Sequence, residues 1–250
     1  MTTRWPDATD RIILEETDST NAVLVCHDGP VPVWCLAHKQ TAARGRRGRA
    51  WASPQGNFFA SVRISPGGAL AGYARYSFVA ALALHDALSD LTNAAGRIVL
   101  KWPNDVLVDG CKTCGILLET AYAPDRTDLV IGFGVNLVAA PRPDEVEPGA
   151  VLPGDLLSLT GVALAAPDLL DHLAVRFDHW SAVLDADGFA DVRTAWLSRA
   201  TGLGARITAR VPNATHHGVF EDIDADGALV LRTDAGRLVL QAADVYFAEN

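Results

Sequence analysis

"IVLKWPNDVLVDGCKTCGILLETAY", residues 98 to 122, alternates apolar runs with turn residues. The three apolar runs are rich in Val, Ile and Leu, residue types that favour strands. Pro103-Asn104-Asp105 separates the first two runs and Asp109-Gly110 separates the last two, and these residue types are typical of turns. This stretch therefore predicts three consecutive strands joined by short turns.

The rest of the chain divides into a mixed part and a β part. Helical periodicity predicts a largely buried helix over 73–91 and two more helices within 167–200, while the Pro/Gly-rich segment 139–154 is expected to be a loop. Further strands are expected in 31–39 and 57–64. From Ala205 onward the pattern shows only short strands and turns. We therefore expect an α+β protein with a catalytic domain over 1–201 and an all-β domain over 202–250, the size of an SH3-like barrel.

Composition excludes several classes of function. The chain has 250 residues, 49% of them hydrophobic, and a net charge of -9, which argues against nucleic acid as its main partner. The N-terminus has no apolar core of a signal peptide and no run is long enough to span a bilayer, so we expect a soluble, cytoplasmic protein. The four cysteines have no secreted-framework spacing, and Cys111 and Cys114 are expected to be packed thiols without metal or redox chemistry.

One motif imitates a metal site. "DIDADG", residues 222 to 227, matches the opening of a calcium loop, but Thr233 stands where a bidentate Glu is required. We expect a hairpin turn in which Asp226 and Gly227 supply positive φ angles, and no metal-ligating residues. The chain also has no P-loop, no dinucleotide-binding glycine motif and no nucleophile elbow.

A cationic loop is the unusual feature of this acidic chain. "QTAARGRRGRAW", residues 40 to 51, places four arginines and two glycines within six positions of one another. Such a loop can bind nucleic acid, remain a solvated surface segment, or close over a small polyanion such as ATP. The chain has only three lysines, Lys39, Lys101 and Lys112, each in or beside a motif.

Five motifs together resemble biotin protein ligases. They are "DSTN" (18–21), the arginine loop (40–51), "KWPNDVLV" (101–108), "CKTCGILLE" (111–119) and "GFGVNL" (132–137), and they occur in that family's order and at about its spacing. The resemblance covers essentially the whole chain. It implies a catalytic domain related to class II aminoacyl-tRNA synthetases and a small SH3-like domain. Fewer than about twenty residues precede "DSTN", so no winged helix-turn-helix is expected before it.

The resemblance also implies a reaction with two steps. Biotin and ATP, with Mg²⁺, give biotinyl-5'-AMP and pyrophosphate, and a lysine of a biotin carboxyl carrier protein or domain then takes the biotin. Arginines on a glycine-hinged loop can neutralise the phosphates and exclude water once both ligands are bound. The partners implied are the carrier protein of a biotin-dependent carboxylase, with no nucleic acid and no membrane. We expect a monomer or a weak homodimer.

The family pattern assigns roles residue by residue. The residues expected to be catalytic are Lys112, Arg46 and Asp105. Those expected to bind biotin are Ser19, Thr20, Asn21, Gln40, Arg44, Gly45, Arg46, Lys112 and Gly115. Those expected to bind ATP are Arg47, Arg49, Trp51, Asn104, Asp105 and Asn136. Lys101 and Trp102 look structural, and Trp51 could equally belong to the core.

Two departures and two alternatives remain. Ala43 replaces the usual first glycine of the loop, which would strain it if that position needs a positive φ, and Thr113 replaces an aliphatic residue. Lipoate ligases and octanoyltransferases share the fold, although their loops differ and a fatty-acyl pocket has less use for polar Ser-Thr-Asn and Gln. A nucleic-acid-binding module is the alternative from another class, and salt-sensitive DNA binding would reveal it.

Overall fold

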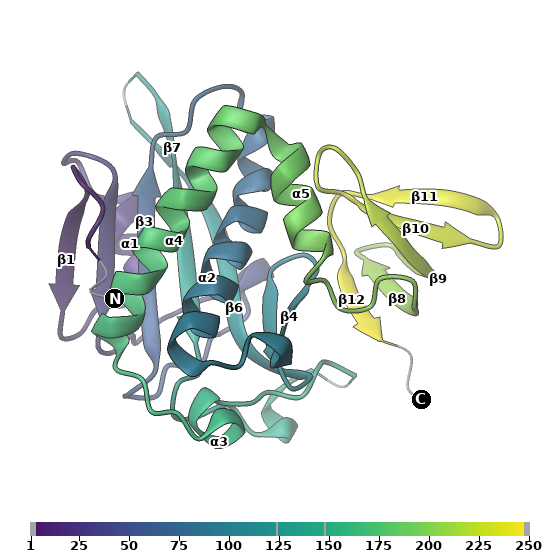
Figure 1. The fold of residues 1–250 in the computed structure, drawn as a ribbon, viewed down its shortest axis with the longest axis horizontal. Coiled ribbons are helices and arrows are strands. Elements are labelled where there is room, and N and C mark those ends of the chain that lie inside the picture. The colour runs from purple at the N-terminus through teal and green to yellow at the C-terminus, as the bar shows by residue number, and fades with distance from the viewer. Residues whose placement is uncertain (1–3, 124, 148, 248–250) are drawn as a thin grey trace.

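A seven-stranded mixed sheet forms the larger part of the computed structural model, which describes residues 4–123, 125–147 and 149–247 (Figure 1). β1 and β2 pair in parallel and all other neighbours pair antiparallel. In spatial order the strands are β1 (Asp10–Leu14), β2 (Val33–Ala37), β3 (Phe58–Ile64), β7 (Thr127–Val135), β6 (Cys111–Tyr122), β5 (Asp105–Val108) and β4 (Ile98–Lys101). The three strands expected in 98–122 are therefore β4, β5 and β6.

The long helices cover one face of this sheet and a short helix covers the other (Figure 1). α2 (Tyr76–Thr92), α4 (Ala166–Asp187) and α5 (Phe189–Leu197) bury the main core, whereas α1 (Thr20–Val25) packs on the opposite face. Successive side chains of β7 point to opposite faces of the sheet. Ile131 therefore lies in the main core, and Val130 lies in the smaller cluster under α1.

The helices expected from periodicity are confirmed, with two differences. The first part of the predicted helix 73–91 is a 3₁₀ turn, Leu70–Arg75, that leads into α2. A short helix, α3 (Leu156–Thr160), follows directly after the predicted loop and was not expected from the sequence. Its N-cap is Asp155, whose carboxylate accepts a hydrogen bond from the backbone N–H of Ser158. None of the helices in the described ranges has the length and hydropathy that a membrane span requires.

A second sheet forms the C-terminal part of the chain, beside the end of α5 (Figure 1). It has five antiparallel strands, and the α+β class is confirmed. In spatial order the strands are β11 (Gly236–Leu240), β10 (Leu229–Thr233), β9 (Ala214–Ile223), β8 (Arg206–Val211) and β12 (Asp244–Phe247).

Two Asp-Gly turns differ in geometry. Asp109 and Gly110, between β5 and β6, both have positive φ, at 49° and 78°. In the 222–227 turn only Gly227 does, at 85°, so the expectation of a positive φ at Asp226 is wrong. The physical reason is Asp224, whose carboxylate accepts hydrogen bonds from the backbone N–H groups of Asp226 and Ala228 and holds a different turn.

Apolar and ionic contacts attach the second sheet to the first. The Trp102 indole donates a hydrogen bond to the Gly227 carbonyl (3.0 Å), and a Cβ added at Gly227 would lie 2.5 Å from the Phe78 ring. A second set of contacts is ionic: Arg47 and Arg49 of the arginine loop both form ion pairs with the carboxylate of Asp244 on β12, at 2.6 and 2.8 Å. The arginine loop is therefore held by the C-terminal sheet.

A buried arginine joins α1 to the main sheet. Arg63 on β3 is 3% exposed, and its guanidinium donates to Asp128 on β7 (2.9 Å) and to the carbonyls of Leu24, Val25 and His27 at the end of α1. The Leu24 carbonyl also accepts a hydrogen bond from the His27 backbone N–H (3.2 Å), and the Arg63 guanidinium is a further donor at this end of the helix, so it caps the C-terminus of α1. Arg63 therefore helps to hold the C-terminal end of α1 against the sheet, together with the apolar contacts of Leu24.

The carboxylate of Asp128 is buried but held ionised. Burial alone would raise its pKa, and hydrogen bonds from Arg126, Ser65 and Arg63 outweigh that effect, so the pKa lies below its ordinary value. A carboxyl group whose pKa is lowered by folding stabilises the folded state above its unfolded pKa. That contribution is lost as the pH falls through the lowered folded pKa.

We expect Asp128→Asn to lower the free energy of unfolding by roughly 3–5 kcal/mol, because it leaves the buried Arg63 charge without its counter-ion. Denaturant unfolding at neutral pH measures this loss. The wild type should also lose stability steeply as the pH falls below about 4, the ordinary carboxyl pKa, and the variant should lose less over the same range.

The matched control is Arg126→Gln. Arg126 bonds the other oxygen of Asp128 at 2.9 Å, but its side chain is 42% exposed, so we expect a loss of no more than about 1 kcal/mol. Equal losses for the two variants would show that the buried Arg63 pair does not fix this part of the fold.

We expect Asp244→Asn to loosen the contact between the C-terminal sheet and the arginine loop. Partly exposed ion pairs of this kind contribute roughly 1 kcal/mol, which corresponds to about fivefold faster amide hydrogen exchange in β12. Exchange in β10 should be unaffected. Asp234→Asn, in the exposed turn between β10 and β11, is the control, and an unchanged β12 in Asp244→Asn would contradict the expectation.

Candidate active site

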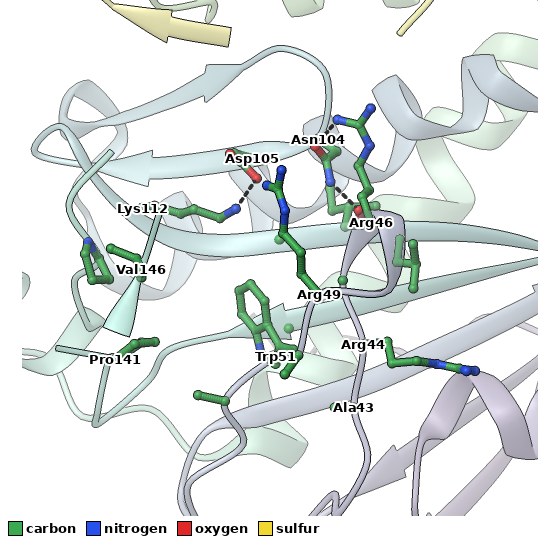
Figure 2. A pocket seen from close by; sticks show the side chains of 18 of the residues that line it. Ala43, Arg44, Arg46, Arg49, Trp51, Asn104, Asp105, Lys112, Pro141 and Val146 are labelled. Atoms are coloured by element: carbon green, nitrogen blue, oxygen red, sulfur yellow. Dashed lines mark hydrogen bonds and ion pairs between the residues drawn. The ribbon is translucent and has the colours of Figure 1, made fainter. Parts of the chain in front are cut away.

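A cavity of about 750 Å³ lies between the β5–β6–β7 part of the main sheet, the arginine loop, residues of 141–147 and 150–153, and β12 (Figure 2). Its volume is within the range of sites for small molecules and cofactors. All the site residues expected from the sequence line this cavity except Arg47, whose guanidinium is bound to Asp244. The five motifs are spread over more than a hundred positions of the chain, from residue 18 to residue 137, and residues from all of them meet in this cavity.

The basic end of the cavity is built around one carboxylate. Lys112 Nζ lies 2.8 Å from Asp105 Oδ1, at an angle that makes this an ion pair without a well-formed hydrogen bond, and Lys101 Nζ lies 3.8 Å from Oδ2 (Figure 2). β5 and β6 pair antiparallel and β4 pairs with β5, so these three side chains come from adjacent strands. The arrangement concentrates positive charge around a single negative group.

Lys101 belongs to this group, although the sequence suggested a structural role for it. Its side chain is 8% exposed and lines the cavity. Burial lowers its pKa, and the neighbouring Asp105 carboxylate opposes that effect. A buried ammonium without enough counter-charge favours the binding of an anion beside it. The sequence analysis did not place Lys101 in the cavity, because "KWPND" predicts a strand followed by a turn and does not show where the Lys101 side chain points.

Arg46 completes the basic end from the arginine loop. Its guanidinium lies 3.4 Å from Asn104 Oδ1, and Asn104 in turn donates to the Ile116 carbonyl at 2.6 Å (Figure 2). Burial lowers the pKa of Arg46, and the nearby Asp244 carboxylate opposes that effect. The guanidinium remains charged, because an arginine side chain does not lose its proton in a protein.

The polar end of the cavity is formed where α1 begins. The side-chain carbonyl of Gln40 accepts a hydrogen bond from the Thr20 backbone N–H (2.8 Å), which leaves the Gln40 amide N–H₂ for the cavity. Ser19, 8% exposed, is the N-cap residue but makes no side-chain cap hydrogen bond. Asn21 lines the cavity too, but its amide bonds inward, to Glu119 and Ser61.

Glycines and a tryptophan form the floor. The Trp51 ring lies directly over Gly115 on β6 and Gly134 on β7, where an added Cβ would come within 2.8 and 2.6 Å of it. Side chains at these positions would therefore push the indole into the cavity. The Trp51 Nε1 is buried and has no partner among the described residues, and Lys112 Nζ lies 5.8 Å from the ring centroid. Trp51 is thus part of the site wall.

The arginine loop is a small hairpin with a tight tip. Gly45 N–H donates to the Arg49 carbonyl (2.7 Å), Trp51 N–H donates to the Ala43 carbonyl (3.0 Å), and the tip has positive φ at Arg47 (57°) and Gly48 (72°). Ala43 is not among the residues with positive φ, so its side chain adds no backbone strain. Arg44 points away from the Lys112–Asp105 pair, toward α1 (Figure 2).

Two acidic groups, Glu147 in the loop before α3 and Asp244 on β12, close the cavity beside the arginine loop. Arg49 bonds both Asp244 (2.8 Å) and Glu147 (3.2 Å), and Glu147 also accepts a hydrogen bond from Tyr246 (3.0 Å). Glu147, Asp244 and Tyr246 all line the cavity and none was expected from the sequence. No motif marks them, because they lie in a loop and in a short strand whose partners are set by the tertiary fold.

Within residues 4–123, 125–147 and 149–247, no three His, Cys, Asp or Glu side chains are grouped so that they could hold a metal ion. All four cysteines are free thiols. Burial raises the pKa of Cys35 to about 12 and raises that of Cys114 too, so neither is a thiolate nucleophile.

Comparison with known proteins identifies both parts of the chain. Residues 15–136 match the "Biotin/lipoate A/B protein ligase family" and residues 202–248 match the "Biotin protein ligase C terminal domain". The structure is similar to that of a biotin protein ligase from Aquifex aeolicus in complex with biotin and ATP. The TM-score is 0.82 at 23% identity, covering 96% of this chain and 99% of that one. At this identity the likeness shows the fold.

Two relatives show the family. A biotin–[acetyl-CoA-carboxylase] ligase from Paracoccus denitrificans is 50% identical over 94% of this chain and 99% of its own length. A bifunctional ligase/repressor BirA from Bacillus subtilis is 32% identical over 93% of this chain and 71% of its own length. The matches run through all five motifs whose residues meet in the cavity. The chain belongs to the biotin protein ligase family.

Proposed function

We propose that this protein is a biotin–[biotin carboxyl-carrier protein] ligase that works in two steps within the cavity. The observation that carries the proposal is the meeting of a polar end, formed by Ser19, Thr20 and Gln40, with a basic end around Lys112, in one cavity. A carboxylic acid with a cyclic urea at its far end and a nucleotide polyphosphate match these two ends in charge and hydrogen bonding.

The first step joins biotin to AMP. A biotin carboxylate oxygen attacks the α-phosphorus of ATP, the bond from that phosphorus to the bridging oxygen breaks, and pyrophosphate leaves. Both reactants are anions, so the barrier depends on neutralising them in line. Three positive charges lie at the basic end of the cavity, on Lys112, Lys101 and Arg46. When no ligand is bound, the Asp105 carboxylate holds the two lysines together.

The second step transfers the biotinyl group to the carrier. The neutral amine of a carrier lysine attacks the carbonyl carbon of the mixed anhydride, the carbon–oxygen bond to AMP breaks, and the nitrogen loses a proton. The anhydride is already activated, so no side chain of the enzyme has to form a covalent bond. Water would compete with the amine, and the arginine loop, with Glu145, Val146, Glu147, Ala150 and Val151, lines the cavity beside the basic residues and limits the access of water.

Magnesium enters with ATP in this proposal. The described residues contain no cage for an ion, and Mg²⁺ is typically held by substrate phosphates together with one or two carboxylates. Asp105 and Glu147 are carboxylates that line the cavity on the side of the basic residues. When bound, the ion withdraws negative charge from the phosphates.

The other roles assigned from the sequence remain part of the proposal. Arg49, Trp51, Asn104 and Asn136 bind the nucleotide, and Arg47 acts by holding the loop to Asp244 until ATP arrives. The remaining biotin contacts come from Arg44, Gly45 and Gly115, with Asn21 acting through its neighbours.

The wider setting of the enzyme is also proposed. The catalytic domain comprises 1–201 and the SH3-like domain 202–250, and each carries one of the two sheets. The partner is a carrier protein or domain of a biotin-dependent carboxylase, and neither nucleic acid nor a membrane takes part. The enzyme is a monomer or weak homodimer in the cytoplasm, where ATP is supplied.

We expect Lys112→Ala to lower the rate of biotinyl-5'-AMP formation by about 10²–10³-fold, because one charge that stabilises the transition state is lost. The measurement is mass spectrometry of purified protein incubated with biotin and Mg-ATP, with octanoate and lipoate in parallel.

Lys39→Ala is the control, because Lys39 is exposed and pairs with Glu16 outside the cavity. It should form the adenylate at the wild-type rate. Octanoyl- or lipoyl-AMP in place of biotinyl-AMP would contradict the substrate assignment. Undiminished biotinyl-AMP from Lys112→Ala would contradict the role of that lysine.

A further inference from the structure

A chain of hydrogen bonds leads from a glutamate outside the cavity to its polar end. Asn21 Nδ2 donates to Glu119 Oε2 (2.6 Å), Ser61 Oγ donates to Asn21 Oδ1 (2.6 Å), and Ser61 Oγ also lies 2.7 Å from Thr20 Oγ1. Glu119 is on β6 and Ser61, fully buried, is on β3. Neither lines the cavity.

The carboxylate fixes the direction of every bond in this chain. An ionised carboxylate only accepts, so Asn21 must turn its N–H₂ group to Glu119 and its carbonyl to Ser61. The Asn21 carbonyl carries no proton, so the single Ser61 proton must lie on that contact. The 2.7 Å contact between Ser61 and Thr20 then needs the Thr20 proton.

The nearest alternative for the Thr20 proton is weaker. Thr20 Oγ1 lies 3.2 Å from the Gln40 side-chain carbonyl, a longer contact than the 2.7 Å to Ser61. Shorter oxygen–oxygen contacts are the stronger hydrogen bonds, so Thr20 donates its hydroxyl proton to Ser61 Oγ and not to Gln40. The Thr20 hydroxyl therefore presents only lone pairs to a ligand, while Gln40 presents an N–H₂ group beside it.

Close packing keeps the chain in this arrangement. A Cβ added at Gly132 on β7 would lie 2.3 Å from Asn21 Oδ1, so a side chain there would displace the amide. Thr20, Asn21 and Ser61 are 3%, 5% and 0% exposed, so water does not readily take the place of these three members, while Glu119 is partly buried. Polar networks that are buried and fully paired hold one arrangement.

We propose that Glu119 is a positioning residue that makes Thr20 an obligatory hydrogen-bond acceptor and so selects a ligand with ring N–H groups. A cyclic urea offers an N–H to Thr20 and a carbonyl to Gln40. The ring or chain of lipoate or octanoate has no N–H to offer, and it leaves the Thr20 lone pairs unpaired. This inference rests on the proposed function, since it identifies the feature of biotin that the polar end recognises.

The test compares two ligands in two forms of the enzyme. The ligands are biotin and its cyclic carbonate analogue, in which both ring N–H groups are replaced by oxygen. The variant is Glu119→Gln, which has the same shape but lets Asn21 take either orientation. Isothermal titration or competition gives the four dissociation constants of a double-mutant cycle.

We expect Glu119→Gln to bind biotin about tenfold more weakly and the carbonate as well as wild type does, or more tightly. In turnover the KM for biotin should rise by the same factor, while kcat and the KM for ATP stay near wild type. An equal loss for both ligands would overturn the proposal, because Glu119 would then act on the fold and not on the N–H. No loss for biotin would overturn it too.

Ser61→Ala removes the hydroxyl on β3 that links Asn21 to Thr20, and so interrupts the same chain of hydrogen bonds at another residue. We expect the same ligand-selective loss, and we expect the double variant with Glu119→Gln to lose no more than either single variant. Additive losses would contradict a shared chain. Glu221→Gln, on the C-terminal sheet, is the matched control and should bind both ligands as wild type does.

The measurements on wild type distinguish a failure of this inference from a failure of the proposed function. If wild type binds no biotin and forms no biotinyl-AMP, the proposed function fails and the role of Glu119 in biotin selection fails with it. If wild type binds biotin but the cycle shows no coupling, only the role of Glu119 is overturned.

Discussion

The buried pair of Arg63 and Asp128 is the constraint on which the rest of the site depends. A guanidinium this deep in a protein must have all its donors satisfied, and here they are divided between a carboxylate on β7 and the carbonyls that end α1. The interaction therefore fixes a six-residue helix that could not be stable alone. That helix carries Thr20 and Asn21 to the cavity.

Small side chains make the cavity possible on a sheet that is otherwise filled. β7 carries Gly132 and Gly134 on the face of α1, and β6 carries Gly115 beside them, so a helix and an indole approach the backbone closely there. On the opposite face the same strands are buried under α2 and α4 by large apolar side chains. One face of the sheet therefore provides the stability and the other provides the space.

Much of the cavity lining could be predicted, because short motifs resemble those of the biotin protein ligase family. That resemblance singled out Lys112 and Thr20, and both line the cavity. Asp244 could not be placed, because its role depends on pairing with Arg47 and Arg49, which lie 197 and 195 positions away in the chain. Arg47 was expected at the nucleotide, and the same pairing holds it outside the cavity lining. The partner of Lys101, Asp105, is only four positions away, but the motif does not show where the Lys101 side chain points. The strand and helix pattern was largely predictable from periodicity. The short helix α3 was not, because five residues carry too little of a 3.6-residue pattern.

The attachment of the arginine loop to Asp244 has a consequence for how the enzyme is made. The two partners Arg47 and Asp244 are separated by 197 positions in the chain, among the longest-range contacts that the fold contains. Synthesis proceeds from the N-terminus, so the main sheet and its helices can form while the loop still lacks its anchor. The strand that carries Asp244, β12, is the last of the described strands in chain order. A newborn chain can therefore assemble the main sheet and its helices first, and the arginine loop is held only after β12 has been synthesised and has paired with β8.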